Sequence, residues 1–189
     1  MLTLHVITAS TREARKGRGV AEWFLAQARG HDRFAIEDVD LAKVNLPMFD
    51  EPRHPRLGQY EHEHTRRWSA IVDRADAFVF VTPEYNYSAP ASLTNAIDFL
   101  YREWLYKPVG FVSYGGVAAG TRSVQIMKLT VTALKMMPMF EAVTIPFFAQ
   151  HFKADTGAFD PGDVQAKAAV AMLDELLKWA NALKPLRGT

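Results

Sequence analysis

The chain has 189 residues, of which 49% are hydrophobic and 23% are charged, and its formal net charge is +1. This composition excludes an intrinsically disordered chain, and the near-neutral charge gives no reason to expect a nucleic-acid partner. Because the sequence contains no cysteine, disulfides, thiolate nucleophiles, cysteine-based metal sites and dithiol redox chemistry are excluded. The length suits one core, so we expect a single domain over residues 1–189.

The start of the chain, Met1 to His5, has neither the basic region nor the long apolar run of a secretory signal. No segment approaches the roughly 20 apolar residues of a membrane span. We therefore expect a cytoplasmic protein that has no membrane partner.

The first 81 residues predict three strands and two helices. Apolar or alternating runs indicate strands at residues 2–8, 34–41 and 78–81. Apolar residues at helical spacing predict a helix that begins near Val20 and a second helix over residues 60–75. Residues 45–58 carry three prolines and are expected to form a long loop.

The remaining residues continue this alternation. Helices are expected over residues 90–104 and 124–137, with a strand at 109–112 between them. Val143 and Ile145 flank the last expected strand.

A final helix is expected to begin at Asp160 and Pro161, which suit the N-cap and the first helical position. Strands and helices then alternate five times along the chain. Alternating elements with apolar strands predict an α/β fold in which helices cover both faces of a parallel sheet.

The loop after the first expected strand is rich in hydroxyl, glycine and arginine residues, and a helix follows it. Backbone N–H groups at a helix N-terminus bind phosphate, and arginine adds charged donors. Neither a Gly-x-Gly-x-x-Gly nor a Walker pattern is present, so the loop suits one terminal phosphate. The alternative is a solvated basic loop. The candidate residues are Ser10, Thr11, Arg12, Gly17, Arg18 and Gly19.

Two further loops follow the third and fourth expected strands. In the first, Tyr85 and Tyr87 flank Asn86, and the tyrosines are suited to stacking on a flat ring; the alternative is a turn with surface tyrosines. In the second, paired glycines let the backbone approach a ligand closely, although they also mark ordinary turns. All three loops are expected at the carboxyl edge of the sheet, where ligands bind in this architecture. The added candidates are Pro83, Glu84, Tyr85, Asn86, Ser113, Tyr114, Gly115 and Gly116.

Four segments form a recognisable signature: Thr82 to Asn86, Asn95 to Phe99, Lys107–Pro108 and Ser113 to Gly116. On these residues the chain resembles the NADPH-dependent FMN reductases, which are flavodoxin-like flavoproteins, over roughly residues 1–145. The resemblance implies a doubly wound, five-stranded parallel sheet of order 2-1-3-4-5. It also implies FMN as cofactor, with NADPH or NADH as electron donor.

By this resemblance, Ser10 and Arg12 contact the FMN phosphate, residues 83–86 line the isoalloxazine, and residues 113–116 run beside the ring. The sequence departs from the family pattern at three places. Ala9 replaces the usual glycine, Thr94 replaces a common lysine, and residues 118–119 are both alanine.

The leading hypothesis is an enzyme that passes hydride from NAD(P)H to FMN and then reduces a small-molecule acceptor, either a free flavin, a quinone, an azo compound or a metal oxyanion. Since the flavin carries the chemistry, no side chain is assigned as a catalytic acid or base. Two alternatives remain, an FMN-bearing electron carrier and a flavin-binding stress or regulatory protein with little turnover.

The two expected helices at 90–104 and 124–137 carry more apolar residues than one buried face requires. We therefore expect a homodimer or a dimer of dimers, with Trp104, Tyr106 and Met136 at the interface. The alternative is that the 45–58 loop or the tail after residue 145 covers this surface.

Other polar residues are weaker candidates. His62 and His64 lie two apart, which does not favour a shared metal on a helix, and no metal site is expected there or at His54. Ser88 lacks the Gly-x-Ser-x-Gly context of a hydrolase nucleophile.

Overall fold

The computed structural model describes residues 1–187. Five strands form one parallel sheet in the order β2-β1-β3-β4-β5. This is the expected flavodoxin-like order, with each strand fed by a crossover that places a helix on the sheet. The strands are β1 (Leu2–Thr8), β2 (Phe34–Asp40), β3 (Ala77–Pro83), β4 (Pro108–Tyr114) and β5 (Met137–Ile145).

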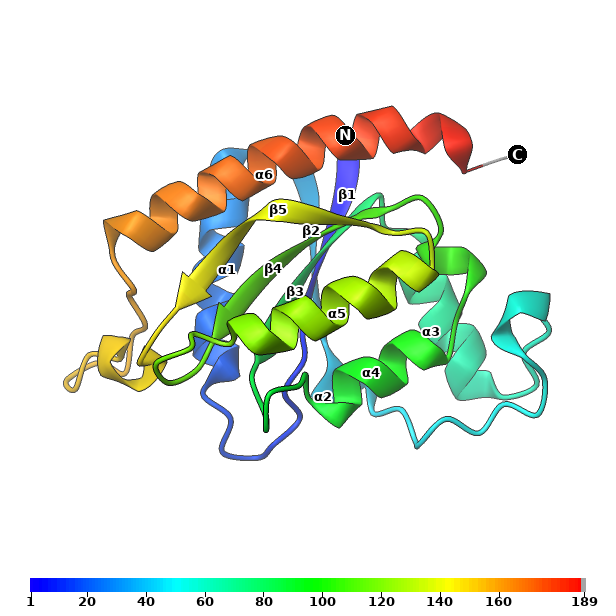
Figure 1. Cartoon of the computed structure of the whole chain (residues 1–189), viewed down its shortest axis with the longest axis horizontal. Helices are drawn as coiled ribbons and strands as arrows, with labels where there is room; N and C mark the ends of the chain where they lie inside the picture. The colour runs from blue at the N-terminus through cyan, green and yellow to red at the C-terminus, as the bar shows by residue number, and fades with distance from the viewer. Residues whose placement is uncertain (188–189) are drawn as a thin grey trace.

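Helices cover both faces of the sheet (Figure 1). Helices α1 (Gly17–His31) and α6 (Asp163–Leu183) lie on one face. Helices α3 (Glu63–Asp73), α4 (Ala91–Asp98) and α5 (Thr121–Ala133) lie on the other, and the short α2 (Leu41–Val44) follows β2. Short 3-10 turns occur at Pro55–Leu57, Arg102–Trp104, Phe148–His151 and Lys184–Leu186.

The apolar residues form one cluster on each face of the sheet. The central strands β3 and β4 are buried along their whole length, as expected for strands covered on both sides. Trp68 and Trp104 anchor the cluster beneath α3 to α5. Phe24 and Leu173 anchor the cluster beneath α1 and α6. Both clusters hold the sheet rigid and fix the positions at which its strands end.

The element boundaries differ from the sequence-based expectations near the second half of the chain. The expected helix at 124–137 ends at Ala133, because Lys135 adopts a left-handed conformation and Met137 already pairs in β5. The expected helix at 90–104 stops at Asp98 and continues only as a 3-10 turn. Some of the apolar residues that were assigned to these two helices therefore lie in turns or in β5. The helices themselves carry fewer apolar residues than the sequence indicated.

The last helix begins later than expected. The Asp160 side chain accepts a hydrogen bond from the Gly162 backbone N–H at 3.1 Å, which forms a turn before the helix. Gly162 is the N-cap of α6, and Pro161 lies outside the helix. Among residues 1–187, no helix has both the length and the apolar character that crossing a membrane requires.

Candidate functional site

The loops that follow β1, β3 and β4 meet at the carboxyl edge of the sheet (Figure 1). They enclose a cavity of about 420 Å3, lined by residues from all three loops and from the segment after β5. The Ser10 and Tyr85 hydroxyl oxygens lie 2.9 Å apart, so a hydrogen bond joins the first loop to the second. The cavity is therefore one site, formed by loops that lie 75 residues apart in the sequence.

One end of this cavity is cationic, since Arg12, Arg15 and Lys16 line it. Arg15 pairs with Asp40 at 2.7 Å, so part of its charge is balanced. Lys16 places its ammonium 5.3 Å from the centre of the Phe152 ring. Arg12 is exposed, and no carboxylate within residues 1–187 forms an ion pair with it. The Arg12 guanidinium is thus free to bind an anion.

Gly17 and Tyr114 fit closely together at the start of α1. A Cβ atom at position 17 would overlap the Tyr114 hydroxyl oxygen, so this position requires glycine. Burial and the nearby Tyr85 hydroxyl raise the pKa of Tyr114 above its ordinary value, and the phenol remains a neutral donor. This contact brings the ring of Tyr114 against the N-terminus of the helix that an anion would face.

The loop after β3 forms a tight hairpin turn. Tyr85 and Ser88 exchange backbone hydrogen bonds at 2.9 and 3.0 Å, and both residues between them have positive φ. Glu84 forms an ion pair with Arg122 at the start of α5. The Arg122 guanidinium lies 4.0 Å from the centre of the Tyr87 ring, which is 62% exposed. Tyr85 therefore faces the cavity, and Tyr87 lies outside it.

The loop after β4 approaches the cavity with its backbone. Gly115 and Gly116 line the cavity, and the Gly115 N–H donates to the Ile145 carbonyl at 3.2 Å. At Gly120, φ is +78°, and a Cβ atom would lie 2.9 Å from the Tyr114 backbone. Glycine at position 120 thus permits the turn that brings the backbone of residues 115 and 116 to the cavity.

The structure brings nine of the candidate residues to the cavity wall: Ser10, Arg12, Gly17, Pro83, Glu84, Tyr85, Tyr114, Gly115 and Gly116. Thr11 lines a neighbouring cleft, and Ser113 is buried at the end of β4. Arg18 turns toward Asp38 and Glu22, which raise its pKa. Asn86 lies in the hairpin turn, and Gly19 packs against Phe152.

Sequence reasoning missed five residues that line the cavity: Ala14, Arg15, Lys16, Phe148 and Ala149. The basic run from Arg12 to Arg18 was the available signal for Arg15 and Lys16. Phe148 follows β5, and no motif marks it in the sequence. Ala9 does not line the cavity, because it is fully buried in the core.

The histidines after β2 have local partners. His64 contacts Asp50 at 2.9 Å, and the His62 ring stacks on the His64 ring at 5.1 Å. His62 precedes α3, so the expectation that these two residues point apart on a helix was wrong. His54 accepts a hydrogen bond from the Arg56 N–H in the turn at residues 55–57.

The residues present fit FMN. A free arginine and the first turn of α1 lie at one end of the cavity, which suits a single phosphate. Tyr85, Tyr114, Phe148 and the glycines after β4 line the same cavity, and aromatic side chains suit contact with a planar ring. Two other clefts are larger, at about 590 and 650 Å3. Neither lies at the edge where the three loops meet, so we place the functional site in the cavity of about 420 Å3.

Comparisons with known proteins identify the family. Residues 2–150 match the family described as NADPH-dependent FMN reductase. The chain is 32% identical to an NAD(P)H-dependent FMN reductase of Nectria sp over 195 residues, covering 98% of this chain and 97% of the relative. It is 40% identical to an NAD(P)H-dependent FMN reductase of Schizosaccharomyces pombe over 144 residues, covering 75% and 72%.

A solved structure shares the fold. The flavoenzyme NAD(P)H:(acceptor) oxidoreductase of Paracoccus denitrificans matches with a TM-score of 0.75 and 24% identity, covering 97% of this chain and 99% of that one. The family match spans most of the chain, and the Nectria relative matches from end to end. This chain therefore belongs to the NADPH-dependent FMN reductase family, as the sequence resemblance predicted, and is an oxidoreductase that uses FMN with NADPH or NADH.

Proposed function

We propose that the cavity at the carboxyl edge holds FMN, with the phosphate at Arg12 and Ser10 and the ring beside Tyr85 and Gly115. The observation that carries this proposal is the unpaired Arg12 in a cavity that Tyr85, Tyr114 and Phe148 also line. When bound, FMN supplies the hydride and electron transfer. In this arrangement Arg12 binds the phosphate, and the Ser10 hydroxyl donates to the phosphate while it accepts from the Tyr85 hydroxyl. The backbone of Gly115 and Gly116 lies beside the ring.

NAD(P)H and the acceptor use the same opening in turn in this proposal, because no dinucleotide fingerprint marks a second site in the sequence. The acceptor is a small molecule: a free flavin, a quinone, an azo compound or a metal oxyanion. Aromatic walls and a flat backbone favour planar acceptors among these. Steady-state kinetics should therefore be ping-pong, with parallel double-reciprocal lines for NADPH against a quinone. Intersecting lines together with a directly observed ternary complex would contradict shared use of the opening.

Stopped-flow absorbance tests the proposed activity. FMN-loaded protein mixed anaerobically with NADPH should lose its flavin absorbance rapidly, and added quinone should restore it. A carrier or a regulatory protein would bind FMN and keep its absorbance through the same mixing. Failure to bind FMN at micromolar concentration would refute the assignment of the site.

A homodimer or a dimer of dimers is also proposed, on a corrected set of residues. Trp104 and Met136 are buried within the chain, so they do not form an interface. Ile126 and Leu129 on α5 are 42% and 75% exposed. Thr130 and Ala133 of the same helix line a cleft of about 590 Å3 between the 49–55 segment and helices α4 and α5. This apolar face suits a twofold partner, which would bury on the order of 1,600 Å² in total.

We further infer one FMN-binding domain over residues 1–189 and a cytoplasmic location. The sheet and both helical layers are built from the length of the chain between β1 and α6.

A further inference from the structure

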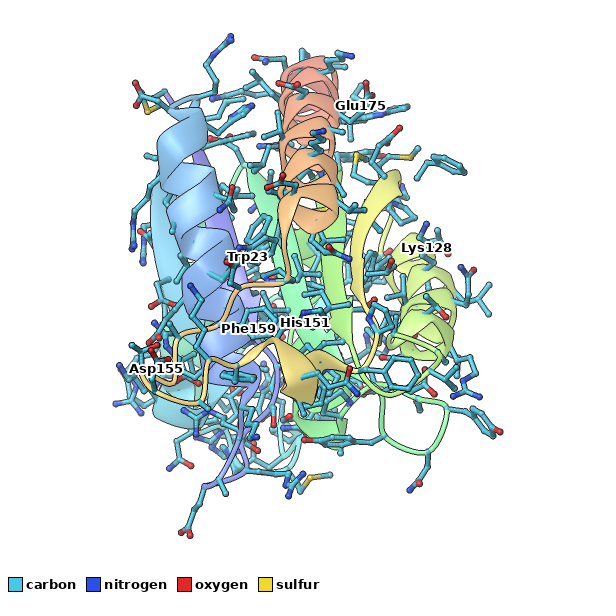
Figure 2. The ribbon with its side chains drawn as sticks, turned by 90° about the vertical axis from the view of Figure 1, so that its left-hand side faces the viewer. Trp23, Lys128, His151, Asp155, Phe159 and Glu175 are labelled. Carbon is cyan, nitrogen blue, oxygen red and sulfur yellow. The ribbon has the colours of Figure 1, made fainter. Side chains whose placement is uncertain are left out.

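Residues 146–160, which make up most of the segment between β5 and α6, are rich in aromatic side chains; we call them the aromatic strap. It folds as a 3-10 turn followed by a small hairpin, in which Phe152 pairs with Phe159. Figure 2 shows Phe159 near Trp23 of α1 and His151 next to Phe159, with Asp155 at the outer turn of the hairpin. The Trp23 and Phe159 ring centres are 6.3 Å apart. The strap therefore lies against the helix whose N-terminus forms the cationic end of the cavity.

One end of the strap is hydrogen-bonded to the glycine loop after β4. The Phe147 N–H donates to the Gly116 carbonyl at 3.1 Å, and the Phe148 N–H donates to the Gly115 carbonyl at 3.2 Å. Phe147 has φ of 45° and ψ of 40°, a left-handed conformation that bulky residues rarely adopt. This turn directs Phe148 onto the Tyr114 ring, with centres 4.9 Å apart. The strap thus fixes both the loop and the tyrosine at the proposed ring position.

The other end of the strap is fixed at α1. A Cβ atom at position 19 would lie 2.8 Å from the Phe152 ring, so glycine at this position lets the ring pack on the helix. The Lys16 ammonium lies over the same ring at 5.3 Å. Phe148 and Phe152 are themselves in contact, with ring centres 6.4 Å apart. A continuous row of aromatic rings therefore runs from Tyr114 to the first turn of α1.

We propose that Phe148 is a flavin-contact residue that supplies an aromatic wall of the site, and that the strap holds it there. This inference rests on the proposed function, since it takes the cavity to be the FMN site. The sequence suggested that Tyr87 would join Tyr85 in contacting the ring, but Tyr87 stacks on Arg122 outside the cavity. Phe148 is half-buried and lines the cavity. It therefore supplies, from the segment after β5, the aromatic contact that Tyr87 does not make.

An affinity comparison between FMN and riboflavin tests this role, because the two ligands share the ring and differ in the phosphate. Phe148→Ala should weaken both ligands by about tenfold, since an aromatic contact with the ring is lost. Phe148→Leu keeps the apolar volume without the ring and should weaken both ligands to a smaller extent. Phe140→Ala is the matched control: this phenylalanine of β5 is 90% exposed and does not line the cavity, so affinity should remain that of the wild type.

Flavin fluorescence quenching gives each affinity, and thermal unfolding of the apoprotein confirms that each variant is folded. Equal affinities for Phe148→Ala and wild type would overturn the inference. A loss confined to FMN would also overturn it, because that pattern belongs to the phosphate end. If Phe148→Ala does not fold, the FMN and riboflavin affinities of Phe148→Leu are compared with those of the wild type in the same way. Absence of FMN binding by the wild type is a separate result, which would refute the proposed site itself.

Discussion

Replacement of Arg12 by alanine tests the phosphate end of the site. Arg12 lines the cavity and pairs with no carboxylate within residues 1–187, so its charge is available for a ligand. Within residues 1–187, its hydrogen bonds are made through its backbone carbonyl, which accepts from the Arg15 backbone N–H and from the Arg15 guanidinium. The Arg12→Ala variant should therefore fold normally, and the change should be confined to anion binding.

The size of the effect follows from the strength of a charged hydrogen bond. Such a bond contributes about 1.5–3 kcal/mol, which corresponds to a loss of roughly ten- to a hundredfold in FMN affinity. Arg15 and Lys16 stay at the same end of the cavity, so weak phosphate binding should remain. Riboflavin lacks the phosphate, and its affinity should barely change.

Arg18→Ala is the matched control for this experiment. Arg18 has the same side chain six residues later, but Asp38 and Glu22 already bind its guanidinium. It does not line the cavity, so its replacement should leave FMN affinity nearly unchanged. Fluorescence titration of both variants with FMN and riboflavin gives the four affinities. Equal losses for FMN and riboflavin in Arg12→Ala, or equal FMN losses in both variants, would contradict the assignment.

Three further predictions concern packing, assembly and pH. Gly17→Ala should displace the Tyr114 ring and weaken FMN binding, and adding Tyr114→Phe to this variant should restore part of the affinity. If FMN titration shows no loss of affinity in Gly17→Ala, the close fit between these two residues is contradicted. In sedimentation experiments at low micromolar concentration, the wild type should be a dimer and Leu129→Asp a monomer. A monomeric wild type would show that no such interface forms. Burial lowers the pKa of His5 to about 4 in the folded protein. Below about pH 6.5 the unfolded chain therefore binds more protons than the folded one, and the free energy of unfolding should fall by on the order of 2 kcal/mol from about pH 7 to about pH 5. Thermal denaturation should show a smaller fall in His5→Gln, and equal falls would exclude His5 as the cause.

The sheet was predictable because its strands carry strong local signals. The runs at β1 and β3 are apolar and bounded by polar loops, so both the number of strands and the three strand-end loops followed from the sequence. The boundary between α5 and β5 was not predictable in this way. Met136 and Met137 continue the apolar spacing of the helix, while the left-handed turn at Lys135 that ends it depends on tertiary packing.

The cavity itself was predicted only in part, for a related reason. Tyr85 and Gly115 lie in motifs beside the strand ends, so their position followed from the topology. Phe148 follows β5 with no motif to mark it, and its place is set by the backbone hydrogen bonds that Phe147 and Phe148 donate to Gly116 and Gly115. Backbone contacts of this kind do not depend on residue type, so no pattern in the sequence records them.

The basic loop shows why charge in a sequence does not by itself define an anion site. Arg12, Arg15 and Arg18 are three residues apart and chemically identical. The strand β2 supplies Asp40 to Arg15 and Asp38 to Arg18, which are 25 and 20 residues apart in the chain. A paired guanidinium must lose one carboxylate to gain a phosphate, whereas an unpaired one gains the whole interaction. Of these three arginines, only Arg12 has no carboxylate partner within residues 1–187, and this is why we propose it as the phosphate ligand. The contrast between Arg12→Ala and Arg18→Ala measures the effect of that difference directly.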